Sequence, residues 1–325
     1  MLRAYISLFT ALFLLGGCAS SSNRQEVGNA ANYGVLIMAH GGEADWNSAI
    51  ESMADEIRDD YIVEIAFGMA DAGSIQDAVH RLEAQGVRQI GVVRLFISGD
   101  SWFERTEQIL GISPGAPMRM MDEAAAAHHG GHAMAFWQID TMSSFALSEE
   151  GLSEAPEMGR VLVERARRLS TDPQQESILI LAHGPADDAE NQRWLSNIDA
   201  RADSVRRALP FRHVEVQTLR EDWAEKRVVS EQRIRSFVEQ AAEHGGPALV
   251  IPYRVYGFGP YAEVLGGLLY VANQEGLLPS PEVELWVRRQ IDLLQRAEFR
   301  NPAQVQNVNP DHGSGLLHME TVPDL

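Results

Sequence analysis

Cysteine and lysine are almost absent from this chain of 325 residues. Cys18 is its only cysteine and Lys226 its only lysine. A single thiol cannot form an intramolecular disulfide, and if Cys18 is lipidated the mature protein has no thiol at all, which excludes thiolate nucleophiles and cysteine metal ligands. A single lysine leaves almost no basis for Schiff-base chemistry or for a phosphate-binding loop that depends on lysine.

Positive charge is also scarce. The chain has 27 Lys and Arg residues against 46 Asp and Glu residues, which gives a formal net charge of −19. A surface this acidic repels phosphate groups, so we expect no nucleic-acid partner and no attraction to anionic lipids. The same surface is compatible with collecting cations.

The N-terminus has the pattern of an export signal. Arg3 precedes an apolar run over residues 4–15, which is too short to span a membrane as a helix. The run ends in Leu-Gly-Gly-Cys at residues 15–18, and this sequence resembles the lipobox of bacterial lipoproteins. An uncleaved anchor or a chance cysteine is the alternative.

The lipobox resemblance implies a processed and anchored protein. Residues 1–17 would be the signal peptide, Cys18 would carry acyl chains, and residues 18–32 would form a flexible tether to the folded part. Ala19 follows the cysteine, in place of the aspartate that retains many such lipoproteins at the inner membrane. The resemblance therefore favours a lipid anchor in the outer membrane, with the protein facing the periplasm.

An internal repeat organises the rest of the chain. The segment GVLIMAHGG at residues 34–42 returns as SILILAHGP at residues 177–185. A short apolar run that ends in Ala-His-Gly before a helical pattern predicts a buried parallel strand leading into a helix. The repeat predicts two α/β halves, each with a histidine, His40 or His183, at the carboxyl end of its first strand.

The pattern of elements is the same in both halves. Apolar runs predict strands at 34–40, 61–67, 89–97, 136–141, 177–183, 213–218, 248–256 and 283–286. Helical periodicity between them includes 46–59, 156–169, 192–209, 228–244, 262–271 and 287–298. Alternating strands and helices with short loops imply parallel sheets and right-handed crossovers.

We therefore predict an α/β fold with two tandem domains that face each other across a cleft. The expected domains are 33–172 and 173–297, each a mainly parallel four-stranded sheet flanked by helices. Residues 113–135 have no counterpart in the second half and are expected to be an insertion. Residues 298–325 are polar and rich in Pro and Gly, which predicts a poorly ordered tail.

The order of these pieces resembles the class II chelatases, the CbiX-like family of sirohydrochlorin cobalt- and iron-chelatases. The resemblance rests on strand-Ala-His-Gly, the Asn-containing helix that follows, Val63 to Phe67, the helix from Ser74, and Ile90 to Gly99. It covers roughly residues 33–297. It implies two tandem chelatase-like domains that insert a divalent metal ion of the cobalt, iron or nickel class into a tetrapyrrole such as sirohydrochlorin. Metal and tetrapyrrole would both be substrates, bound between the halves.

The chain departs from the family pattern at the metal site. The family's second metal-binding histidine follows the third strand, where this chain has Asp100-Ser101-Trp102 and Gly259-Pro260-Tyr261. The acidic residue that the family carries after its second strand falls on Met69, with Asp71 nearby. This departure keeps two alternatives open, which are a periplasmic protein that binds metal or tetrapyrrole without turnover, and an interaction lipoprotein with an inactive site.

Histidines are the candidate metal ligands. His40 and His183 could bind a metal ion or accept a pyrrole proton, or they could be structural groups at helix starts. His128, His129 and His132 form a histidine-rich cluster with methionines close by in the sequence, which suits a separate metal site or is simply a solvated loop.

Two arginines and two glycines are the candidate ligand-binding residues. Arg94 and Arg254 occur in otherwise apolar third strands, where they could bind tetrapyrrole carboxylates or pair with interior acidic residues. Gly257 and Gly259 could let main-chain amides approach a carboxylate, or they could form an ordinary turn.

Overall fold

The computed structural model describes residues 32–119 and 134–302. Several predictions lie outside the described residues: the signal peptide, the lipobox-like segment with Cys18, the cluster His128, His129 and His132, and most of the tail. Among the helices of the described ranges, we find none with the length and apolar character needed to cross a membrane.

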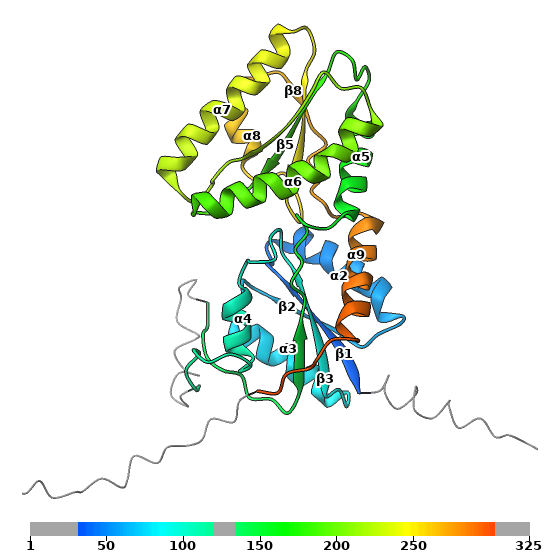
Figure 1. The fold of residues 1–325 in the computed structure, drawn as a ribbon, viewed down its shortest axis with the longest axis vertical. Coiled ribbons are helices and arrows are strands. Elements are labelled where there is room, and N and C mark those ends of the chain that lie inside the picture. The colour runs from blue at the N-terminus through cyan, green and yellow to red at the C-terminus, as the bar shows by residue number, and fades with distance from the viewer. Residues whose placement is uncertain (1–31, 120–133, 303–325) are drawn as a thin grey trace, which may run out of the picture.

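Two parallel four-stranded sheets form the frame of the molecule (Figure 1). The first contains β1 (Tyr33–Ala39), β2 (Val63–Phe67), β3 (Gln89–Leu95) and β4 (Ser144–Leu147), in the order β2-β1-β3-β4. The second contains β5 (Ser177–Ala182), β6 (His213–Thr218), β7 (Ala248–Tyr253) and β8 (Tyr270–Val271), in the order β6-β5-β7-β8. Ala39 pairs with Phe67 as Ala182 pairs with Thr218. The predicted α/β class and four-stranded parallel sheets are confirmed.

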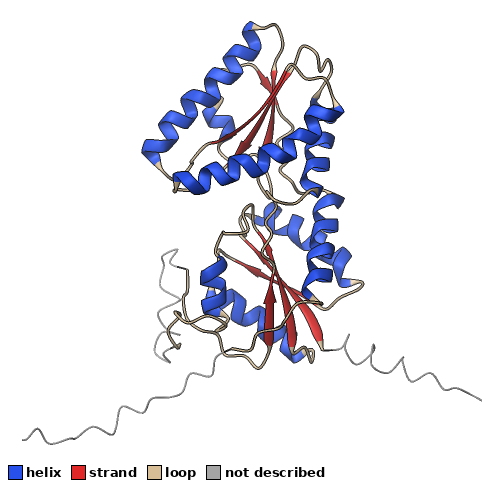
Figure 2. Ribbon diagram, in the orientation of Figure 1, coloured by secondary structure: helices blue, strands red, loops and turns tan. Residues whose placement is uncertain are grey.

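Helices cover both faces of each sheet (Figure 2). They are α2 (Ala44–Arg58), α3 (Ala72–Ala84), α4 (Phe103–Ile109), α5 (Glu157–Leu169), α6 (Asp188–Ala208), α7 (Ala224–Glu243), α8 (Tyr261–Val264) and α9 (Pro281–Leu294). Side-chain caps fix where several begin, because an N-cap oxygen satisfies an unpaired amide of the first turn. Asp71, for example, accepts from the Ser74 amide, and Asp187 from the Glu190 amide.

Three of the predicted elements are wrong. Residues 136–141 form no strand; Trp137 and Ile139 pack on the core beneath α3 and α4, and the pairing strand is the short apolar run β4. Residues 283–286 belong to α9, since Ser280 caps this helix and Pro281 occupies its first turn. The predicted helix 262–271 ends at Val264, and after Gly267, at a φ of +80°, the chain enters β8.

The helices that cover the inner face of each sheet are partly exchanged between the halves. Helix α5, which follows β4, lies against α6 and β7 of the second half, whereas the C-terminal helix α9 returns to lie against α2 and β3 of the first (Figure 1). One continuous apolar core therefore joins the inner faces of both sheets. Trp286 of α9 is fully buried in this core, and its indole nitrogen donates to Glu150, 2.9 Å away.

Truncating Trp286 tests the importance of the returning helix. We expect Trp286→Ala to lower the free energy of unfolding by about 3–5 kcal/mol, because it leaves a large cavity in the shared core. The measurement is urea denaturation followed by circular dichroism. The adjacent residue Leu285 is 51% exposed, so Leu285→Ala should change stability by less than about 0.5 kcal/mol. Equal effects of the two variants would contradict the exchanged packing.

Candidate functional site

The two repeated histidines have the same local geometry. His40 follows β1 and His183 follows β5, and in each ring Nδ1 lies 2.7 Å from the carbonyl oxygen of the next glycine. A carbonyl only accepts, so Nδ1 carries the proton and the lone pair of the neutral ring is on Nε2. Both glycines, Gly41 and Gly184, have positive φ angles. The repeat thus presents two imidazoles with a basic nitrogen pointing away from their own loops.

The edges that carry these histidines face each other. Trp46, at the start of α2, lies against Tyr256, which follows β7, with ring centroids 6.3 Å apart. Asp100, after β3, forms an ion pair of 3.2 Å with Arg193 of α6. Both contacts join the carboxyl-end edge of one sheet to that of the other, which is where open α/β sheets bind ligands. No hydrogen bond, ion pair or ring contact within residues 32–119 and 134–302 joins His40 directly to His183.

His183 lies beside two carboxylates. Its Nε2 is 2.9 Å from Oδ2 of Asp222 and 3.5 Å from Oε1 of Glu221, and the ring meets Trp223 edge-on at 5.8 Å. Each ring nitrogen therefore faces an acceptor. A cation between Nε2 and the carboxylates would satisfy the acceptors on both sides.

Main-chain hydrogen bonds hold the acidic loop against the histidine loop. The Leu219 amide donates to Ala182 and the Arg220 amide donates to His183, at 2.9 and 2.7 Å. Arg220 has a φ of +57°, a conformation that bulky residues seldom adopt. Its buried side chain donates to the carbonyls of Pro185 and Ala186, so the two loops behave as one unit.

Arg254 pairs with an interior acidic residue, which was one of its two predicted roles. Its Nη1 lies 2.9 and 2.8 Å from the two carboxylate oxygens of Glu221. Gly259 leaves room for this guanidinium, because a Cβ at that position would lie 2.8 Å from Arg254 Cζ. Burial alone would lower the pKa of Arg254, but Tyr261 and Glu221 more than offset it, so the pKa is raised and the group stays charged.

Arg94 has a different role from either of those predicted. Its guanidinium donates to the main-chain carbonyls of Ser148, Gly99 and Ser101, and the residue is 2% exposed. Burial lowers the pKa of Arg94 to about 10. Arg94 therefore braces the turn after β3 from inside the protein.

The first half uses its acidic residue for structure. Asp71, after β2, accepts from the Ser74 amide through one carboxylate oxygen and from the Ala135 amide through the other, at 2.9 and 2.7 Å. Ala135 comes at the end of the predicted insertion, so Asp71 anchors that segment. His40 stacks on Trp46 at 5.5 Å and is exposed, and its Nε2 has no partner in the described part of the chain.

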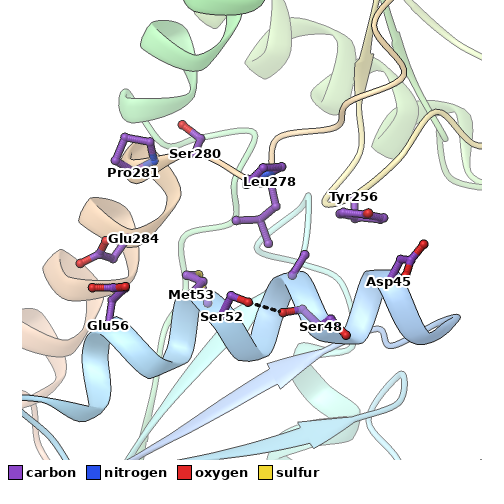
Figure 3. Close-up of a pocket in the computed structure, with 12 residues that line it drawn as sticks. Asp45, Ser48, Ser52, Met53, Glu56, Tyr256, Leu278, Ser280, Pro281 and Glu284 are labelled. Carbon is purple, nitrogen blue, oxygen red and sulfur yellow. Dashed lines mark hydrogen bonds between the residues drawn. The ribbon is translucent and has the colours of Figure 1, made fainter.

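A groove lies to one side of these residues. It has a volume of about 700 Å³ and runs between α2 and the segment that leads into α9, close to Tyr256 (Figure 3). Asp45, Glu56 and Glu284 line it, and no basic side chain does. A ligand with many carboxylates is not complementary to this surface.

The carboxylates beside His183 were not predicted from the sequence. Glu221 and Asp222 lie three and four residues after the end of β6, and Asp222 corresponds to Asp71 of the first half, so the signal was present in the second repeat. Within the described ranges, no group of three or more His, Cys, Asp and Glu side chains could hold a metal ion as it stands. The His183 cluster is therefore a partial ligand set.

Comparison with known proteins supports the family resemblance. The CbiX family profile matches residues 34–169. The first half is CbiX-like. A search of curated proteins gave no significant sequence match.

Solved structures with the same fold include two SirB structures and one larger protein. SirB from Bacillus subtilis with Fe³⁺ superposes with a TM-score of 0.55 at 12% identity over 80% of this chain and 94% of SirB. SirB from Bacillus subtilis subspecies spizizenii, a sirohydrochlorin chelatase in complex with cobalt, gives a TM-score of 0.51 at 12% identity over 80% and 96%.

The larger protein is DR2241 from Deinococcus radiodurans, a multi-domain protein with structural similarity to chelatases. It gives a TM-score of 0.51 at 17% identity over 83% of this chain, which spans 56% of DR2241. These likenesses establish a chelatase-like fold that continues past the CbiX-like half into the second domain. The clustered carboxylates at a histidine thus occur in the half that the family profile does not cover.

The short distance between Gly259 and the Arg254 guanidinium predicts that alanine at position 259 lowers stability more than alanine at position 257. Gly259 and Gly257 have φ angles of +64° and +72°, but a Cβ at Gly257 would meet nothing within 4 Å. Gly257→Ala should cost about 1–2 kcal/mol of stability from backbone strain alone. Gly259→Ala should cost at least about 1 kcal/mol more, because the methyl group displaces the guanidinium. Thermal unfolding measures both, and equal losses would contradict the tight contact.

Proposed function

We propose that the protein is a chelatase-like envelope lipoprotein that binds a divalent metal ion at His183 and inserts it into a tetrapyrrole. Cobalt or iron is the proposed class of metal, and sirohydrochlorin is the proposed kind of macrocycle. The observation that carries the proposal is the approach of the Asp222 carboxylate to within 2.9 Å of Nε2 of His183.

The spacing of these atoms suits two ligands of one ion. Imidazole nitrogen and carboxylate oxygen bind first-row divalent metals at about 2.1 Å, which places two ligands at right angles about 3 Å apart. His183 Nε2 and Asp222 Oδ2 are separated by 2.9 Å. An ion between them would bind the lone pair on Nε2 and the carboxylate oxygen that faces it.

A partial ligand set is appropriate for a metal that is a substrate. Closed sites with four protein ligands retain their metal as a structural part, whereas catalytic sites leave positions open. His183 and Asp222 supply two ligands, and both are accessible to solvent, with side chains 29% and 68% exposed. The remaining positions are free for water and then for pyrrole nitrogens.

His40 supplies a base on the opposite edge. Metal insertion replaces two pyrrole N–H protons by the ion, so both protons need acceptors. Nε2 of His40 carries a free lone pair and can take one of them, while solvent takes the other. His40 is exposed beside Trp46, so a macrocycle can reach its Nε2 from solvent.

Binding without turnover is the second candidate function. The positions of the family's second histidine are occupied here by Asp100, which is paired with Arg193, and by Gly259, which accommodates Arg254. A protein that only carries metal or tetrapyrrole needs no second histidine. Measuring binding and insertion separately distinguishes the two functions.

Histidine variants provide the first functional test. Purified protein is titrated anaerobically with sirohydrochlorin and Co²⁺, and insertion is followed by absorbance. We expect His183→Ala to weaken Co²⁺ binding by about 10–100-fold, since it removes a ligand. His40→Ala should slow insertion by about 10²-fold or more, since it removes the base, and leave Co²⁺ binding intact. The double variant should lose less than the sum of the single losses in insertion.

His213 provides the control. It lies at the start of β6, at the opposite end of that strand from Glu221 and Asp222, and pairs with Glu215 at 3.1 Å. His213→Ala should leave binding and insertion unchanged. Co²⁺ binding without insertion by the wild type would favour the carrier function. Unchanged binding in all the histidine variants would rule out both functions.

We also propose that Cys18 anchors the protein to the outer membrane, facing the periplasm, with support from the sequence Leu-Gly-Gly-Cys at residues 15–18. The wild type should partition into detergent and carry acyl mass on Cys18, because several acyl chains hold a protein stably at a membrane. Cys18→Ser should remain unprocessed. Mass spectrometry of the N-terminal peptide is the measurement, and an unmodified mature N-terminus elsewhere would overturn the proposal.

A further inference from the structure

We propose that Arg254 restrains Glu221 from closing on the ion beside His183, so that the metal stays weakly held and can be released. This inference rests on the metal site proposed above and adds the group that sets how tightly that site binds. Arg254 is a positioning residue in this scheme, because it acts through Glu221 and not on the ion.

The two carboxylates beside His183 differ in freedom. Asp222 has a side chain that is 68% exposed, and its Oδ2 lies 2.9 Å from Nε2 of the imidazole. Glu221 is only 13% exposed, lies farther from Nε2 at 3.5 Å, and directs both of its oxygens to Arg254. Asp222 can therefore move to bind an ion beside His183, whereas Arg254 holds Glu221 in place.

The fold provides space for this restraint. Gly259 has no side chain at the point where the Arg254 guanidinium passes, and the ring of the buried Tyr261 lies 5.8 Å from Arg254 Cζ. Glu221 itself is held by the preceding residue, whose amide is bonded to the carbonyl of His183. Neither partner of the pair can easily move away from the other.

The positive charge of Arg254 also weakens metal binding, as its contact with Glu221 does. With Arg254 in place, one of the two carboxylate charges near His183 is already balanced, so a dication meets a weaker field. Without Arg254, the negative charge of Glu221 is no longer balanced, and both of its carboxylate oxygens are available to bind the ion. The site would then have three protein ligands and would hold a divalent ion more tightly.

The inference makes an unusual prediction for Arg254→Met. Co²⁺ affinity, measured by calorimetry on the full chain without tetrapyrrole, should rise by about tenfold or more, the scale on which groups surrounding a metal site act. Transfer of Co²⁺ to sirohydrochlorin should become slower. A merely structural role would instead weaken both binding and transfer. Arg254→Lys, which keeps the charge, should resemble the wild type.

Variants of the two carboxylates give a test that does not depend on the folding of Arg254→Met. Asp222→Asn should weaken Co²⁺ binding by about tenfold or more, because it removes a ligand. Glu221→Gln should change it less than about threefold while Arg254 is present, because the glutamate is held away from the ion. In the Arg254→Met background, Glu221→Gln should abolish the gain in affinity, as expected for a coupled pair.

The outcomes separate this inference from the proposed function. If His183→Ala binds Co²⁺ as the wild type does, the metal site itself is wrong. If His183→Ala loses binding but Arg254→Met binds as the wild type or more weakly, only the role of Arg254 is wrong. A loss of affinity in Glu221→Gln equal to that in Asp222→Asn would also overturn it, since Glu221 would then already be a full ligand.

Discussion

The need to cover an apolar sheet face is the constraint on which the rest of this structure depends. Each sheet has an inner face that its own half covers only in part, with α2 on the first sheet and α6 on the second. Helix α9 completes the cover of the first sheet and α5 that of the second. The resulting shared core holds the carboxyl-end edges of the two sheets opposite each other, as the contacts Trp46–Tyr256 and Asp100–Arg193 show.

The two repeats keep one backbone geometry and use it differently. In both, a histidine with its Nδ1 bonded to the next glycine follows the first strand. In the second half the neighbouring acidic residues turn towards that histidine, and in the first half Asp71 holds the chain at Ala135 instead. Duplication thus supplies two equivalent imidazoles, and the surrounding loops give one of them carboxylates and the other an aromatic neighbour.

The fold could be predicted from the sequence, because the strands are continuous apolar runs and the repeat indicates their order. It was less informative where apolar side chains pack without sheet pairing and where a charged side chain forms hydrogen bonds with the main chain. Residues 136–141 look like a strand, yet Trp137 and Ile139 bury their rings and methyl groups without sheet pairing. Arg94 resembles a ligand-binding arginine, but carbonyl groups far away in sequence, such as that of Ser148, satisfy it. The Ser280-Pro281 signal for the start of α9 was readable and was missed.

At the candidate site too, the sequence predicts local motifs but not contacts between residues far apart in the chain. The positions of His40 and His183 follow from a local motif, whereas the partnership of Glu221 with Arg254 depends on a contact between residues 33 positions apart. Spacing along the chain cannot reveal which oxygen faces which nitrogen.

The return of α9 also sets the order in which the protein can be built. Ribosomes deliver the first sheet early, but α9, which completes the cover of its inner face, follows every other helix and strand that the structure describes. Until then Val93 and Leu95, which are fully buried in the finished protein, lack part of that cover. The nascent chain therefore passes through a long interval with exposed apolar strands, in which aggregation competes with folding and chaperones have most to protect.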